Sequence, residues 1–411
     1  MRRNNSFIFK LFHFCIVVMT MTTVLMLSGC IEEYEADIPS EDTNLLVVEG
    51  TICAGRLNQF FLSRTQPLRS EHDYPDVYAS NYYGTYYYPR MVVGAHVSVR
   101  GSDGSEYVAE EAGGCYTCKM GFLAPDVEYR LHIEYDGEVY ESEPQRPLQT
   151  EKIAEVKGVQ NTPDSRIDIL VTPAEPFLPD QTNYYSWTYE ETWEVRPAYR
   201  SVVYYDIEKK QPVVDHYLYP ERGWMDATGP TIMTGSSNNY DGQHIRGLKL
   251  YDLSRDDERL YYKYSGLVHQ RAITKAEYEY ELARRQAGSE MGGLFTPQPS
   301  ALPTNIRCLT SSKRVIGFVG CSMNTSDYRF FLHPGDFSLY RPGRKDTRLW
   351  LENPSDAECC RLASHNMYLS EWDDERMFGG KLRTAWAYLF ELDVRALGAY
   401  IDQPYYWTID R

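Results

Sequence analysis

Nine cysteines carry most of the reactive chemistry of this 411-residue chain, and Cys30 stands apart from the other eight. It directly follows Leu27-Ser28-Gly29, whose small residues leave room for a peptidase to cut before the thiol. A thiol so placed can be alkylated by a diacylglyceryl group, and two or more acyl chains anchor a protein stably to a membrane. The motif therefore predicts lipidation at Cys30. The alternative is an ordinary secreted protein whose signal ends in Cys.

The residues before Cys30 have the order of a secretory signal. Arg2, Arg3 and Lys10 form a basic start, and an uncharged apolar run follows from Phe14 to Leu27. Basic, apolar and small residues in this order indicate a signal peptide over residues 1–29. The apolar run is shorter than the roughly 20 residues that a membrane-spanning helix needs, so a transmembrane anchor is the weaker interpretation.

The other cysteines of the mature chain are expected to be structural. They are Cys53, Cys115, Cys118, Cys308, Cys321, Cys359 and Cys360. In an exported protein such residues indicate disulfides, and the last six are our candidates, although an odd number leaves at least one thiol unpaired. Cys115-x-x-Cys118 lacks the helix N-terminus that activates a redox thiol and the second pair of a zinc ribbon. A structural disulfide or inert thiols remain the two alternatives there.

No strong catalytic motif is present elsewhere. The chain lacks His-Glu-x-x-His, Gly-x-x-x-x-Gly-Lys and Gly-x-Ser-x-Gly. The acidic clusters at 256–258 and 373–375 lack the alternating, Gly-punctuated ligands of a calcium loop, so solvated charge is the better interpretation. We therefore expect no enzyme activity, no cofactor and no metal site. A hydrolase assembled from residues far apart in sequence stays open.

Composition limits the class of partner. The formal net charge is −16 and the isoelectric point is near 5.1, so nucleic acid is not an expected partner. Tyrosine is abundant, with 35 residues, and suits half-buried sheet faces and wet interfaces. Five lie together in an insertion over 71–90, and we predict that they contact a ligand or partner: Tyr82, Tyr83, Tyr86, Tyr87 and Tyr88. The alternative is a loop that packs on its own domain.

Strand-like segments dominate the mature chain. Short apolar-alternating runs separated by Gly and Asp turns over 44–150 predict an immunoglobulin-like β-sandwich. A larger β-rich domain is expected over 151–411, with a strand at 386–392. One helix is expected near 274–287, because Thr274-Lys-Ala-Glu277 has capping-box order and Gly288 is a natural stop. The fold class is thus mainly β with one short helix.

Several motifs, taken in order, resemble a known family. They are Leu46-Val47-Val48-Glu49-Gly50, Tyr129-Arg130-Leu131 before Asp136-Gly137, Asn183-Tyr184-Tyr185-Ser186-Trp187, and Cys359-Cys360-Arg361. In this order they look like Bacteroidota outer-membrane lipoproteins that share a domain of unknown function, number 4249. The acidic cluster over residues 31–37 similarly resembles a surface-export signal of such lipoproteins, and residues 30–43 as a whole suit a flexible acidic tether. The chain departs from the pattern where a Trp is usual near Cys359-Cys360-Arg361, since it has Ser370-Glu371-Trp372 at some distance instead.

The resemblance implies a function. Members are typically encoded beside SusC-like TonB-dependent receptors, in the position of a SusD-like lipoprotein. We therefore expect a lipid-anchored protein on the outer face of the outer membrane. Its expected partners are a TonB-dependent receptor and, through Cys30, membrane lipid, and its expected role is nutrient capture or uptake without catalysis. The alternative is an adhesive or structural surface protein that binds glycan or protein through the Tyr-rich loop.

Overall fold

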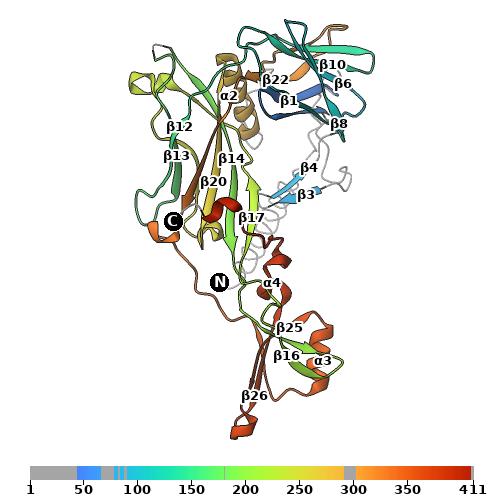
Figure 1. The fold of residues 1–411 in the computed structure, drawn as a ribbon, viewed down its shortest axis with the longest axis vertical. Coiled ribbons are helices and arrows are strands. Elements are labelled where there is room, and N and C mark those ends of the chain that lie inside the picture. The colour runs from blue at the N-terminus through green and yellow to red at the C-terminus, as the bar shows by residue number, and fades with distance from the viewer. Residues whose placement is uncertain are drawn as a thin grey trace, which may run out of the picture. The chain divides into compact units, whose positions relative to one another are not determined.

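A computed structural model describes residues 44–65, 78–81, 84–87, 90–179, 181–290 and 302–408, and these residues are mainly β (Figure 1). Cys30, the signal peptide and the tether lie outside them. None of the described helices is long and apolar enough to span a bilayer.

Two sheets near the start of the described chain share one hydrophobic core, and we call them the N-terminal sheet pair. The first runs in the order β22 (Val315–Ser322), β1 (Leu46–Cys53), β2 (Leu57–Arg64), β9 (Cys115–Lys119) and β8 (Glu110–Ala112), and β5 (Arg90–Met91) also pairs with β2. The second runs β21 (Ile306–Cys308), β11 (Glu138–Ser142), β10 (Tyr129–Tyr135), β6 (His96–Gly101) and β7 (Glu106–Val108). Alternate residues such as Val48 and Phe60 of the first sheet and Val99 and Leu131 of the second fill the core.

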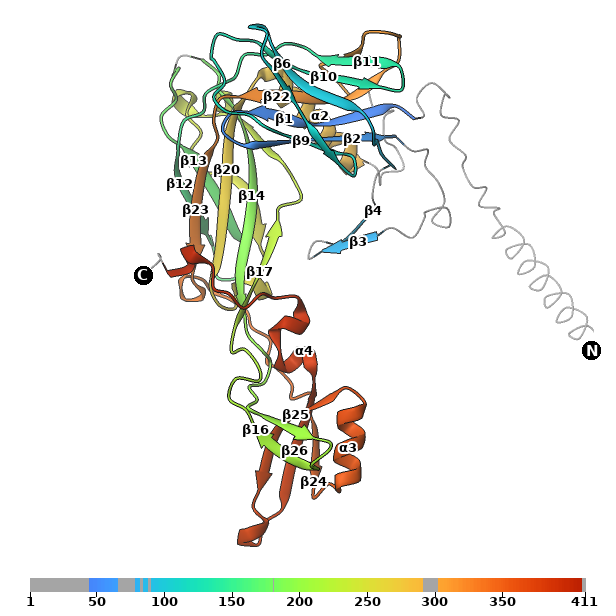
Figure 2. The same ribbon diagram turned by 45° about the vertical axis from the view of Figure 1, so that its right-hand side comes forward.

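Residues from far along the chain complete both of these sheets. β22 pairs in parallel with β1 over eight positions, and β21 pairs antiparallel with β11 (Figure 2). Our sequence-based division at residue 150 does not include these two strands. The close approach of β22 to β1 needs Gly317, whose φ is +134° and where a Cβ would collide with the carbonyl oxygen of Val48.

The middle of the chain forms two further sheets around a second core, and we call them the central sheets. One is β12 (Ile153–Val159), β13 (Ile167–Pro173) and β19 (Leu248–Leu253). The other runs β17 (Gly223–Thr228), β14 (Tyr184–Val195), β20 (Tyr264–Ile273) and β23 (Ser326–Leu332), with β18 (Met233–Ser236) also paired to β14. Their core holds Ile169, Trp187, Tyr264 and Leu332.

A third core lies among residues from 203–214 and 349–392. It packs the hairpin β15 (Val203–Asp206) and β16 (Gln211–Val214) and the sheet β24 (Leu349–Glu352), β26 (Leu382–Tyr388) and β25 (Met367–Asp374) around Trp386, together with helix α3 (Asp356–Ser364). A separate hairpin joins β3 (Tyr78–Asn81) and β4 (Gly84–Tyr87).

The predicted helix is confirmed and extended, but it is not alone. α2 spans Lys275–Glu290, whereas α3 and the short α4 (Leu389–Leu392) were not predicted. The strand expected at 386–392 is wrong beyond Tyr388, where the chain turns into α4. The Glu391 carboxylate accepts a hydrogen bond from the backbone N–H of Tyr388 at 3.0 Å, and this contact favours the helical turn over a continued strand.

Candidate functional site

Helix α2 packs against both the central sheets and the N-terminal sheet pair, with contacts to β14, β18 and β22 (Figure 1). Its start is fixed by Thr274, whose hydroxyl accepts a hydrogen bond from the backbone N–H of Glu277 at 3.1 Å. The Tyr280 ring lies 5.6 Å from that of Phe318, centroid to centroid. The Glu277 carboxylate lies so close to Gly320 that a side chain there would collide with it. The helix is therefore held tightly over β22.

A cavity of about 490 Å³ lies between α2, the outward face of the first sheet and strands β14 and β20 of the central sheets, and we call it the α2 cleft. Its apolar wall comes from β1, β2, β22 and α2, and its polar groups come from the same elements, the turn between β1 and β2, β14 and β20. Its lining includes Glu49, Cys53, Arg56, Leu57, Phe61, Arg271, Glu277, Tyr280, Glu281, Arg284 and Phe318. A cavity of a few hundred Å³ where separate cores meet is a usual place for a ligand.

Opposite charges are paired inside this cleft. Arg271 of β20 and Glu277 of α2 form an ion pair of 2.5 Å, and their side chains are only 16% and 5% exposed. Glu281 and Arg284 form a second pair at 2.8 Å along the helix. The Nη1 atom of Arg271 is buried and has no hydrogen-bond partner among the described residues. A buried guanidinium donor without a partner is costly, so this atom is the point where a ligand acceptor would gain most.

Burial favours the neutral forms of two further groups of the cleft, the Tyr280 hydroxyl and the Cys53 thiol. It raises the pKa of Tyr280 to about 12, so its hydroxyl stays protonated at neutral pH. Burial also raises the pKa of the Cys53 thiol. The cleft thus offers guanidinium and phenol donors, carboxylate acceptors and aromatic faces, but an inert thiol. This set can bind a polar molecule in a defined orientation.

Three of the described histidines, His132, His244 and His269, contact groups other than a nucleophile. His132 and His269 contact carboxylates, and His244 contacts the backbone carbonyl of Pro173. None of these three rings is bonded to a hydroxyl or thiol nucleophile. Within the ranges that the structure describes, no cluster of three or more His, Cys, Asp or Glu side chains is placed to hold a metal ion.

Comparison with known proteins places the chain in a family. The family model described as a domain of unknown function, DUF4249, matches residues 31–327. The chain belongs to this family. All the lining residues named for the α2 cleft fall within the matched DUF4249 segment.

The other comparisons add little. No curated protein matches the chain. Among solved structures it is similar to a DUF4785 family protein from Legionella pneumophila subsp. pneumophila str. Philadelphia 1, at 10% identity and a TM-score of 0.15. That match covers 56% of this chain and 51% of the other, so the DUF4249 chain spans about half the length of that protein.

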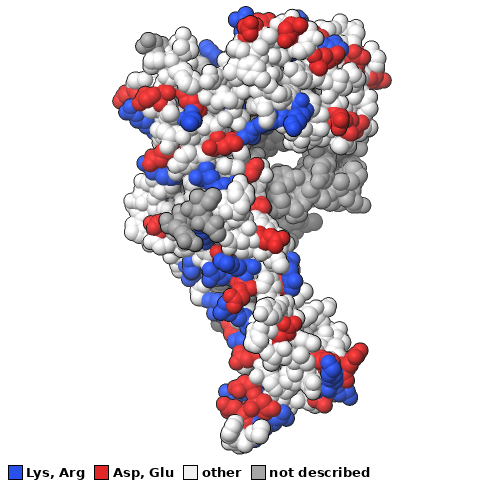
Figure 3. All heavy atoms as spheres, in the orientation of Figure 1, with Lys and Arg blue, Asp and Glu red and all other residues white. Residues whose placement is uncertain are grey.

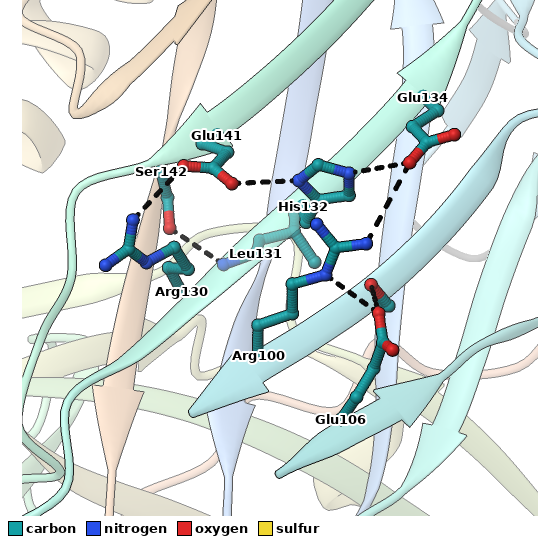
Figure 4. A network of polar contacts seen from close by, with 9 residues as sticks. Arg100, Glu106, Arg130, Leu131, His132, Glu134, Glu141 and Ser142 are labelled. Carbon is teal, nitrogen blue, oxygen red and sulfur yellow. Dashed lines mark hydrogen bonds and ion pairs between the residues drawn. The ribbon is translucent and has the colours of Figure 1, made fainter. Parts of the chain in front are cut away.

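His132 belongs to a polar network on the outward face of the second sheet (Figure 4). Leu131 and Ile133 face the core, so His132 between them points outward, directly across from Glu141 on β11. Its Nδ1 lies 2.9 Å from Glu141 and its Nε2 lies 2.9 Å from Glu134. Burial raises the pKa of Glu141, but the hydrogen bonds from His132 and Arg130 outweigh it, and the net pKa is lowered.

This network continues through Arg100, which pairs with Glu106 at 2.8 Å and approaches Glu134 at 3.9 Å. Figure 3 shows acidic and basic side chains interspersed over the drawn face as a whole. Because the charged groups of the network already contact one another, we interpret it as structural support for the sheet rather than a ligand site.

The predicted disulfides do not form in the structure. All six candidates, Cys115, Cys118, Cys308, Cys321, Cys359 and Cys360, are unbonded, as is Cys53. Residues three apart on a strand, like the first two, point to opposite faces of the sheet, and adjacent residues on α3, like the last two, point about 100° apart. Neither arrangement brings the Cβ atoms as close as a disulfide requires.

Burial and hydrogen bonding shift the pKa values of the thiols in opposite directions. Burial raises the pKa of Cys118 and of Cys359 to about 11, and that of Cys321 to about 12. Burial also raises that of Cys308, but hydrogen bonds with Ser311 and Thr310 outweigh it, and the net pKa is lowered.

The other predicted site residues are only partly placed. Tyr82, Tyr83 and Tyr88 lie outside the described residues. Tyr86 and Tyr87 belong to β4, which pairs with β3 in a short hairpin.

Sequence reasoning did not identify Arg271, Tyr280 or Glu281 as site residues, and it assigned Glu277 only a capping role. The available signal was a charged helix start directly after a long strand, but nothing in it shows which sheet the helix covers.

Proposed function

We propose that this DUF4249 protein is a surface-exposed outer-membrane lipoprotein, anchored through Cys30, that assists a TonB-dependent receptor in capturing a nutrient and is not an enzyme. The signal and lipobox support the anchor, and family membership supports the SusC-like partner. The observation that carries the proposal is the α2 cleft, whose buried Arg271 keeps a guanidinium donor without a partner among the described residues.

The cleft suits reversible capture. Its paired charges, Arg271 with Glu277 and Arg284 with Glu281, can accept polar groups of either sign without a large net charge. At its edge, Leu57 and Phe61 are 60% and 40% exposed and give an apolar surface beside the charges. A few placed polar groups against an apolar wall give orientation and specificity to a bound molecule.

We further propose that the N-terminal sheet pair is immunoglobulin-like. Two mainly antiparallel sheets of short strands around one core support this class. Strand β22, which comes from beyond residue 150 and pairs in parallel with β1, is an addition to that plan.

Affinity purification tests the proposed partnership. The tagged full chain is expressed in its native host, and the outer membrane is solubilised in detergent and analysed by mass spectrometry. A TonB-dependent receptor in near-equal amount with the wild type is expected. The Cys30→Ser variant, which cannot be lipidated, should leave the membrane fraction and lose the receptor. A lipoprotein that is purified alone, or with membrane proteins in no fixed ratio, would count against the proposal.

The cleft is tested in the same preparation by native mass spectrometry of small molecules carried by the protein. Arg271→Gln should lower any bound mass seen with the wild type. Arg200→Gln is the matched control, because the Arg200 side chain is 74% exposed, lies outside the cleft and pairs with the similarly exposed Glu221. If the wild type and both variants carry equal amounts of bound small molecule, the cleft is not the capture site. That result would leave the proposed receptor partnership unaffected.

A further inference from the structure

A second cavity lies on the outward face of β14, opposite the core of the central sheets. Trp193 faces that core, so Thr192 beside it points outward, directly across from Asp226 on β17. The C-terminal turn η9 (Tyr405–Thr408), dark red in Figure 1, lies against this face. Trp407 anchors the turn, since its ring lies 6.3 Å from that of Trp224 and its carbonyl accepts a hydrogen bond from Lys263 at 2.8 Å.

The turn and the strands enclose a volume of about 550 Å³, which we call the C-terminal pocket. It is lined by Glu190, Glu191, Thr192, Asp226, Ala227, Thr228, Arg329, Tyr405 and Tyr406. Its volume falls within the usual range for small-molecule sites, about 300–1,000 Å³.

Asp226 is held ready as an acceptor in this pocket. Its Oδ1 accepts hydrogen bonds from the Thr192 hydroxyl at 2.7 Å and the Tyr400 hydroxyl at 3.1 Å. Both contacts go to one oxygen, and no described residue donates to Oδ2. The Thr192 hydroxyl also lies 2.9 Å from that of Tyr406. The carboxylate is therefore fixed in orientation and keeps one oxygen for a ligand.

Arg329 is fixed as a donor beside it. Its guanidinium carbon lies 3.5 Å from the centroid of the Tyr406 ring, and its Nη1 donates to the Ser265 hydroxyl at 3.1 Å. The stacked geometry holds the guanidinium plane, and its other N–H groups point to no described partner. Next to it, Tyr405 is 84% exposed and presents an aromatic face at the pocket.

A carboxylate, a guanidinium and an exposed aromatic ring together fit a carbohydrate. Neighbouring hydroxyls of a sugar both donate and accept, so they match a fixed acceptor next to a fixed donor. The apolar C–H face of a sugar ring packs on a tyrosine ring, which is flat, rigid and apolar. A charged ligand would fit less well: an anion would meet Asp226 and Glu190, and a cation would meet Arg329.

We propose that the C-terminal pocket is a carbohydrate-binding site that takes a neutral sugar residue. The family model ends at residue 327, so Arg329, Tyr400, Tyr405 and Tyr406 lie outside the part shared with that model. The pocket thus combines strands within the family match with segments that lie beyond it. The inference goes beyond the receptor partnership and does not depend on it.

The test is a glycan array probed with the detergent-solubilised full chain, followed by calorimetric titration of the best oligosaccharide. The array carries neutral, sialylated and amino-sugar oligosaccharides. Tyr405→Ala and Asp226→Asn should each weaken binding about tenfold or more, since each removes a strong contact. Tyr217→Ala is the matched control, because Tyr217 is 95% exposed outside the pocket and its loss should change nothing.

Tyr405 is exposed, so its variant is expected to fold, and the thermal midpoint of every variant is measured to verify this. The proposal is overturned if no neutral oligosaccharide binds above background. It is also overturned if both pocket variants bind like the wild type, or if only charged glycans bind. None of these outcomes affects the receptor partnership, which the membrane purification tests separately.

Discussion

Replacing Arg259 with methionine tests the ion pair buried in the core of the central sheets. Glu191 of β14 is 1% exposed, and its Oε1 lies 2.7 Å from Arg259 Nη1 and 2.5 Å from the Tyr264 hydroxyl. Arg259 also bonds Asp257, 2.7 Å away. Arg259→Met leaves the Glu191 carboxylate without its cation, and breaking a buried pair in this way costs about 3–5 kcal/mol of unfolding free energy.

The loss should depend on pH. Burial raises the pKa of Glu191, even though Arg259 and the Tyr264 hydrogen bond lower it. A folded-state pKa above the unfolded one means that the folded protein binds the proton more tightly. This carboxyl therefore favours folding below its ordinary pKa and loses that contribution as pH rises through the folded value. Without Arg259 the pKa rises further, so the variant should be weakened more at pH 8 than at pH 5.

Urea unfolding followed by tryptophan fluorescence at both pH values measures this. The double variant Glu191→Gln/Arg259→Met removes both charges and keeps an acceptor for Tyr264, so it should recover most of the loss. Arg200→Met, at an exposed pair, should stay within about 0.5 kcal/mol of the wild type. The reasoning is refuted if the single variant loses less than about 1 kcal/mol, or if the double variant loses as much as the single.

Three further outcomes follow from local geometry. Gly317→Ala should destabilise the protein by at least about 2 kcal/mol in urea, because its φ and the adjacent β1 carbonyl exclude a side chain. Gly343→Ala, which meets open space, should not; equal losses would contradict the strand pairing. In differential alkylation at pH 8, Cys308 should react well before Cys321, whose pKa burial raises to about 12, since only the thiolate reacts. Ser355→Ala should cost about 1 kcal/mol of unfolding free energy by removing the N-cap of α3, and an unchanged urea midpoint would argue against that cap.

The helix starts show what local sequence can and cannot predict. Thr274 predicts the first residue of α2, and its hydroxyl caps the helix as expected. Glu277 was expected to be the second partner of the capping box, but its carboxylate pairs with Arg271 of the preceding strand. Ser355-Asp-Ala-Glu358 carries the same signal and forms the complete capping box, in which both partners bond. We did not predict that helix, although the pattern was there to find.

Long-range pairing is the part that the sequence alone does not determine. The strand at 46–53 is evident from its β-branched residues, but its parallel partner lies at 315–322, more than 250 residues later and after most strands of the central sheets. No turn chemistry links the two strands, so only packing of the completed core selects their pairing. The α2 cleft depends on this pairing, because Phe318 of β22 forms one wall and Tyr280 of α2 packs on it. Its residues are therefore visible only in the folded chain.

Native mass spectrometry of the complex purified through the tagged full chain is the most direct test of the proposed role. Our account predicts a species whose mass equals the lipidated chain plus one TonB-dependent receptor in a fixed ratio, and its absence with Cys30→Ser. Recovery of the lipidated chain alone from intact outer membranes, under conditions that keep other receptor complexes together, would contradict it.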